Sequence, residues 1–164
     1  MHSDEEILRF AIRVGAALAE SERRLVTAES CTGGWLGKAL TDVPGSSSWY
    51  DGGIVAYSNK LKQALLGVTH STLVSYGAVS EHCAREMAVG ALETLGAQLS
   101  VAVTGIAGPD GGMPGKPVGT VWFAWAWVLD MNIETRVHVE RFAGDREAVR
   151  RQTVAYALSG LLEL

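Results

Sequence analysis

The eight residues 27–34, TAESCTGG, constrain the fold of this chain more than any other stretch. They follow the short apolar run Leu25–Val26 and precede the run 35–40, which is typical of a helix, so the pattern predicts a tight turn from a strand into a helix. Gly33 and Gly34 permit such a turn, because a residue without a Cβ adopts backbone conformations that other residues avoid. A turn of this kind directs small polar side chains and free backbone N–H groups toward one point.

The polar residues of this segment, Ser30, Cys31 and Thr32, have two interpretations. In the first, they are nucleophiles or hydrogen-bond donors beside a helix start whose unpaired N–H groups favour an anion or a developing oxyanion. In the second, the segment is only a capped helix start, with Ser30 or Thr32 as the N-cap. The segment by itself does not decide between them.

The pattern along the rest of the chain alternates between helix and strand. Ser3 and Glu6 form a candidate capping box at the start of the first helix. In chain order we expect a helix over 4–21, a strand over 24–28, a helix over 34–40, a strand over 52–57, a helix from 60, a short helix over 71–76, a helix over 81–95, strands over 99–104, 120–129 and 134–142, and a helix over 145–162. This order predicts an α/β fold, a three-layer α/β/α sandwich around a mixed β-sheet, in a single domain of residues 1–164.

Composition excludes several classes of function. The net charge is −4 and no basic stripe is visible, which argues against a nucleic-acid partner. No apolar run is long enough to span a bilayer and the acidic N-terminus is not a secretory signal, so we expect a cytoplasmic protein without a membrane partner. Two cysteines and four scattered histidines give neither a disulfide framework nor metal-ligand spacing, and we expect no metal and no cofactor.

Three clusters could supply reacting groups: residues 30–34, 57–60 and 104–108. They converge if the strands that precede them are parallel neighbours, because ligands bind at the carboxyl edge of such a sheet. A serine near a neutral lysine can cleave an amide, since the lysine takes the hydroxyl proton and returns it to the leaving amine. Lys60 is the candidate base, and its alternative is an exposed residue in the first turn of a helix.

Three other features have two interpretations each. Cys31 is either a small buried residue or a thiolate activated by a helix N-terminus. The loop over 105–119, which contains six glycines and three prolines, is either a surface loop or a lid over a substrate. Arg146 and Arg150 share one face of the last predicted helix, either as surface charges or as a phosphate-binding pair.

Several segments in order along nearly the whole chain form one set of motifs: TAESCTGG, GGIVAYSNKLKQALLGV, GAVSE, VTGIAGPDGG followed by KPVGTVWFA, and GDREAVR. Together these motifs resemble the CinA C-terminal domain family of nicotinamide-nucleotide amidases. This resemblance implies hydrolysis of the carboxamide of nicotinamide mononucleotide (NMN) to nicotinate mononucleotide and ammonia, in pyridine nucleotide salvage.

The resemblance also implies roles for individual residues. It implies Ser30 as nucleophile, Lys60 as general base and Tyr57 as a site tyrosine. It further implies substrate contacts at Thr32, Gly33, Gly34, Ser47, Asn59, Thr104, Gly105 and Arg146. Backbone N–H groups in the turn 32–34 or at Gly105 are expected to stabilise the oxyanion. We expect NMN as a small-molecule substrate and a homo-oligomeric assembly.

Two rival functions remain open at this point. One is an amidase that uses Cys31 as its nucleophile. The other is a non-catalytic nucleotide-binding or regulatory module, in which the glycine turns hold a phosphate.

Overall fold

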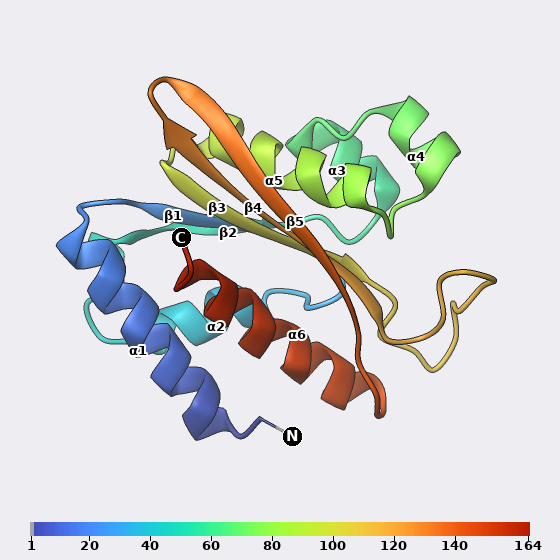
Figure 1. Ribbon diagram of the computed structural model, residues 1–164, viewed down its shortest axis with the longest axis horizontal. Coiled ribbons are helices and arrows are strands. Elements are labelled where there is room, and N and C mark those ends of the chain that lie inside the picture. Colours follow the sequence, from blue (N-terminus) through green and yellow to red (C-terminus); the bar gives the residue numbers. More distant parts are fainter. Residues whose placement is uncertain (1) are drawn as a thin grey trace.

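The computed structural model describes residues 2–164 and contains a five-stranded mixed sheet in the order β2-β1-β3-β4-β5. The strands are β1 (Leu25–Glu29), β2 (Tyr50–Val55), β3 (Leu99–Gly105), β4 (Thr120–Leu129) and β5 (Asn132–Arg141). The helices are α1 (Asp4–Glu20), α2 (Trp35–Thr41), α3 (Asn59–Leu66), α4 (His70–Tyr76), α5 (Glu81–Leu95) and α6 (Arg146–Leu161), with a short 3₁₀ helix, η1, at Ser46–Ser48. Helices α1, α2 and α6 cover one face of the sheet and α3, α4 and α5 the other (Figure 1), which confirms the predicted α/β/α sandwich.

Local sequence determines where several elements begin. The Ser3 hydroxyl accepts the Glu6 N–H at 3.2 Å and the Glu6 carboxylate accepts the Ser3 N–H at 2.7 Å, so the predicted capping box starts α1. Asp145 is the N-cap of α6. Strand β2 begins at Tyr50, two residues earlier than predicted, because Tyr50 already pairs with Leu25 of β1.

Strand β4 separates two hydrophobic cores that differ in side-chain size. Phe123 and Trp125 point toward α1 and α6, whereas Ala124 and Ala126 point toward α5. The small side chains allow α5 to approach the sheet closely, and the Ser100 hydroxyl of β3 donates to the α5 backbone at 2.7 Å. Both helical layers are therefore fixed against the strands whose ends carry the candidate site.

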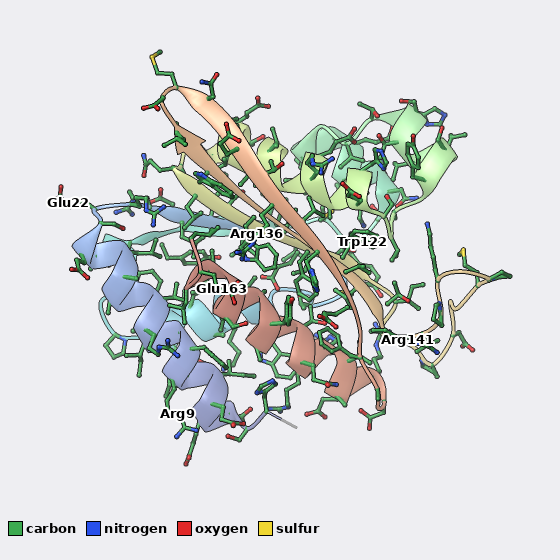
Figure 2. The ribbon with its side chains drawn as sticks, viewed as in Figure 1. Arg9, Glu22, Trp122, Arg136, Arg141 and Glu163 are labelled. Atoms are coloured by element: carbon green, nitrogen blue, oxygen red, sulfur yellow. The ribbon has the colours of Figure 1, made fainter. Side chains whose placement is uncertain are left out.

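Arg136 connects the outer strand β5 to the C-terminal end of the chain through a hydrogen bond and an ion pair. Figure 2 shows this residue on β5, beside α6 and close to Glu163. Its guanidinium donates to the Gly160 carbonyl at 2.7 Å, pairs with the Glu163 carboxylate at 3.2 Å and lies 4.6 Å from the centre of the Trp125 ring. These contacts hold the C-terminal end of α6, the helix whose first turn reaches the candidate site.

The carboxyl ends of three parallel strands meet at one edge of the sheet. Strand β1 pairs in parallel with both β2 and β3, while β4 runs antiparallel to β3 and β5. The chain leaves β1 into the turn 30–34, β2 into residues 56–58, and β3 into the loop 106–119 (Figure 1). The three predicted clusters therefore converge, as expected from parallel neighbours. Among the described helices, none combines the length and the apolar character needed to cross a membrane.

Candidate active site

Ser30 is the first residue after β1 and lies at the carboxyl edge of the sheet. Its N–H donates to the Val103 carbonyl at 3.1 Å, which continues the parallel ladder by one more bond. The Gly33 N–H then closes the turn on the Ser30 carbonyl at 3.1 Å. Gly33 and Gly34 have φ angles of +60° and +98°, in the left-handed region that favours glycine. The predicted strand-to-helix turn is confirmed, with Ser30 at its first position.

The start of α2 is capped by Glu29, not by the predicted Ser30 or Thr32. The N-cap residue is Gly34, which has no side-chain cap. The Glu29 carboxylate, only 2% exposed, accepts the N–H groups of Gly34, Leu36 and Gly37 at 3.2, 2.9 and 3.0 Å, and the Thr32 hydroxyl at 2.6 Å. The second interpretation of the segment, a cap by Ser30 or Thr32, does not hold, because the longer Glu29 side chain reaches the amides from the end of the strand. A carboxylate of the chain itself therefore fills the place where an external anion was expected.

The lysine beside Ser30 is Lys62. Its Nζ lies 2.9 Å from the Ser30 Oγ, and it also donates to the carbonyls of Ala56 at 2.9 Å and Tyr57 at 3.0 Å. A neutral amine has two hydrogens and one lone pair, so the two carbonyls can take both hydrogens and leave the lone pair for the serine proton.

The environment of Lys62 favours this neutral form. The side chain is only 2% exposed, and burial lowers the pKa of its ammonium, while the nearby Cys83 and Cys31 act in the opposite direction. A lysine of lowered pKa in contact with a serine is the arrangement that proton transfer from the hydroxyl requires.

Lys60, the predicted base, does not contact Ser30. It is exposed on the first turn of α3, and its ammonium takes part in no hydrogen bond or ion pair within residues 2–164. Helix α3 starts at Asn59, and residues two positions apart in a helix point about 200° apart, so Lys60 and Lys62 cannot face the same side. Lys62 instead lies one turn before the buried Leu66 and shares its face, whereas the equally apolar pair Leu61 and Leu65 is exposed, so the sequence alone did not show which lysine points inward.

A cavity of about 260 Å³ opens at this edge of the sheet, with Ser30 and Lys62 in its wall. Residues 106–108, 110 and 111 of the long glycine-rich loop line it, so this loop is part of the candidate site. Six of the predicted site residues form the wall together: Ser30, Tyr57, Asn59, Thr104, Gly105 and Arg146. The Thr104 hydroxyl itself is engaged, because it donates to the Ala78 carbonyl at 2.8 Å.

Tyr57 and Arg146 lie together in the wall of this cavity. The Arg146 guanidinium donates to the Gly108 carbonyl at 2.7 Å and to the Tyr57 hydroxyl at 3.2 Å. The Tyr57 hydroxyl thus contacts the arginine, whereas its backbone carbonyl contacts Lys62. Arg146 pairs with no carboxylate in the described part of the chain, which leaves its charge available to an anionic ligand.

Four predicted substrate contacts lie outside this cavity. Thr32 is fully buried and bonded to Glu29, and Gly33 and Gly34 line a separate surface depression beside Trp35. Ser47 lies in η1, which precedes β2, and its carbonyl accepts a hydrogen bond from Arg24 at 3.0 Å. It is therefore at the amino end of β2, at the sheet edge opposite to the cavity, and the expected contact is corrected for that reason.

Cys31 borders the cavity, but its environment disfavours a thiolate. The residue is 6% exposed, and burial raises the pKa of its thiol to about 12. The helix N-terminus that could have lowered the pKa is already occupied by the Glu29 carboxylate, which raises it further. At neutral pH this thiol is protonated and a poor nucleophile.

Arg146 and Arg150, which the sequence pattern placed on one face of the last helix, lie in different surroundings. Arg146 lines the cavity, whereas Arg150 lies in a separate depression beside Gly33 and Gly34 of the turn 30–34. The Arg150 Nε donates to the Cys31 carbonyl at 3.1 Å and its Nη2 to the Thr32 carbonyl at 2.9 Å. Only Arg146 is therefore placed to meet a ligand inside the cavity.

Comparison with known proteins adds independent findings. The model of the CinA C-terminal domain matches residues 8–164. The chain is 50% identical over 159 residues to nicotinamide-nucleotide amidohydrolase PncC of Escherichia coli K12, covering 97% of this chain and 94% of the relative. It is also 50% identical over 162 residues to the protein of the same name from Pseudomonas putida, covering 98% of each.

A solved structure agrees with these matches. A competence/damage inducible protein from Agrobacterium tumefaciens superposes with a TM-score of 0.92 at 42% identity, covering 96% of this chain and 94% of that one. Sequence and fold thus agree over almost the full length, and the chain belongs to the CinA C-terminal domain family.

Proposed function

We propose that this protein is an amidase that hydrolyses the carboxamide of NMN to nicotinate mononucleotide and ammonia. The observation that carries the proposal is the buried 2.9 Å contact between Lys62 and Ser30 in the cavity wall. The reaction and its substrate come from the names of the relatives that are 50% identical to this chain.

The proposed reaction proceeds through an acyl-enzyme. The Ser30 Oγ attacks the carboxamide carbon while Lys62 accepts the hydroxyl proton, and Lys62 then gives that proton to the departing nitrogen, which leaves as ammonia. A water molecule next attacks the nicotinoyl ester on Ser30. Lys62 accepts a proton from this water and returns it to the Ser30 oxygen, which restores the enzyme and releases the carboxylic acid.

The charges of the cavity suit those of NMN. The substrate has an anionic phosphate at one end, for which Arg146 and the Tyr57 hydroxyl provide donors in the cavity wall. Its pyridinium ring is cationic and disfavours a second positive charge nearby, so bound substrate favours neutral Lys62. The phosphate thus fits the proposed role of Arg146 and Tyr57 as its donors, and the pyridinium ring fits the proposed role of Lys62 as a neutral base.

Release of ammonia from NMN is the direct test. We expect purified protein to form ammonia and nicotinate mononucleotide in equal amounts, without an added cofactor. The measurement is a coupled ammonia assay together with chromatography of the nucleotide. Binding of NMN by calorimetry without any release at high protein concentration would instead support the non-catalytic binding module.

Cys31 provides the test against the thiol alternative. We expect Cys31→Ala to keep kcat within about threefold of wild type, because a buried, protonated thiol contributes packing but no nucleophile. Iodoacetamide is expected to leave the wild-type enzyme active for the same reason. Abolition of turnover in this variant, with its fold intact by circular dichroism, would move the nucleophile to the cysteine.

A further inference from the structure

Arg150 is a partly buried cation to which the proposed reaction gives no role. Its guanidinium pairs with no carboxylate in the part of the chain that the structure describes. It donates instead to the carbonyls of Cys31 and Thr32, two consecutive peptide groups of the turn that begins with Ser30. A planar fork that binds two adjacent carbonyls restrains both peptide planes at once.

The hydrogen bonds of this turn leave few backbone donors free. The N–H groups of Ser30, Gly33 and Gly34 donate to Val103, Ser30 and Glu29 respectively. The N–H groups of Cys31 and Thr32 donate to no other residue among those described, but of the two residues only Cys31 lines the cavity beside Ser30. The amide that follows a nucleophile is a usual oxyanion donor at a strand-to-helix turn.

A second free donor lies at the end of β3. The Leu99 N–H donates to β1 through the Arg24 carbonyl, and the Ile106 N–H donates to the β4 side through the Thr120 carbonyl. Because successive N–H groups along a strand alternate in direction, the Gly105 N–H is directed to the β1 side. Strand β1 has ended there at Glu29, so this N–H faces the turn, and it forms no hydrogen bond with residues 30–34.

We propose that the N–H groups of Cys31 and Gly105 bind the developing oxyanion, and that Arg150 is the positioning residue that orients the first of them. This inference rests on the proposed amidase function. Arg150 holds the carbonyl on one side of the Cys31 Cα, and the proposed donor N–H lies in the peptide group on the other side of the same Cα, in a residue that lines the cavity. The Ser30 carbonyl, which belongs to the same peptide group as the Cys31 N–H, accepts the Gly33 N–H, and such chained hydrogen bonds strengthen a donor.

The test compares Arg150→Gln and Arg150→Lys with the matched control Arg151→Gln. Arg151 lies on the same helix and beside the same Trp35 ring, but it pairs with Asp4 and Glu147 instead of the turn. We expect the Gln variant to lose about 10- to 100-fold in kcat on NMN with KM nearly unchanged, the Lys variant to lose less, and the control to match wild type.

Binding of a transition-state mimic separates positioning from general destabilisation. In the aldehyde analogue of NMN, the Ser30 Oγ would add to the aldehyde carbon and form a hemiacetal whose oxygen mimics the oxyanion. Nicotinate mononucleotide binds without forming such an adduct. We expect Arg150→Gln to lose affinity for the aldehyde by the same factor as kcat and to keep its affinity for the acid. If the Gln variant does not fold, the Lys variant supplies the same comparison.

Two results would overturn the inference while the amidase proposal stands: wild-type kcat in both Arg150 variants, or a raised KM with unchanged kcat. Equal losses of affinity for the aldehyde and the acid would also contradict it, since they would indicate a substrate contact. An inactive wild-type protein would instead overturn the proposed function, and with it the inference that rests on it.

Discussion

Replacing Ser30 with alanine is expected to lower kcat on NMN by about three orders of magnitude or more, because under the proposed mechanism it removes the oxygen that forms the acyl-enzyme. The fold is expected to survive, since the hydroxyl contributes one contact to Lys62 and none to the core packing. KM is expected to change little, because Arg146 and the cavity walls remain. The measurement is steady-state ammonia release together with thermal unfolding.

Ser47→Ala is the matched control for this experiment. Family resemblance gives Ser47 a substrate contact, but the structure places it at the opposite edge of the sheet, so its variant is expected to behave as wild type. Mass spectrometry of a rapidly quenched wild-type reaction offers a second observation, a nicotinoyl ester on Ser30. A Ser30→Ala enzyme that retained more than about a tenth of wild-type kcat would refute the assignment of the nucleophile.

Lys62→Ala and Lys62→Arg are expected to be almost inactive at saturating NMN. Alanine removes the proposed base, and arginine keeps a positive charge that it cannot lose at any usable pH. Lys60→Ala is the matched control on the same helix, and we expect it to retain activity because its side chain is exposed. The reverse result, an active Lys62→Ala enzyme and an inactive Lys60→Ala enzyme, would move the base to Lys60.

The pH profile gives this assignment an independent readout. Only the neutral amine can accept the serine proton, so kcat/KM should rise with pH as Lys62 of the free enzyme loses its proton. Burial disfavours the ammonium, so the midpoint should lie below the ordinary lysine pKa of about 10.4. The Lys60→Ala variant should show the same midpoint as wild type. A profile that is flat, or that falls as pH rises through this range, would exclude a lysine base.

Local patterns were sufficient for most of the fold. The capping box at Ser3 and the start of the last helix near residue 145 each depend on neighbours in sequence. The start of β2 was harder to predict, because its pairing with Leu25 depends on a partner strand. The convergence of three clusters followed from a single assumption, that the strands before them are parallel neighbours.

The sequence predicted which segments form the candidate site, but not which of their side chains contact one another. The motif YSNKLK contains two lysines, and both the cluster 57–60 and the family resemblance indicated Lys60, whereas the structure places Lys62 on the buried face with Leu66. Glu29 was missed because no local pattern shows that the last residue of a strand will cap the following helix. The position of Ser47 depends on which end of β2 faces the cavity, and this follows only from the assembled sheet.

The carboxylate of Glu29 also limits where a phosphate group could bind under the proposed function. Because the chain supplies its own counter-anion at the start of α2, that helix end has no capacity left for a phosphate group. Under the proposed function the phosphate must be recognised by Arg146 on α6, while the carboxamide is recognised by the turn that follows β1. The distance between these two elements then selects ligands that carry both an amide and a phosphate. Free nicotinamide, which has the amide but no phosphate, makes only the contacts at the turn that follows β1.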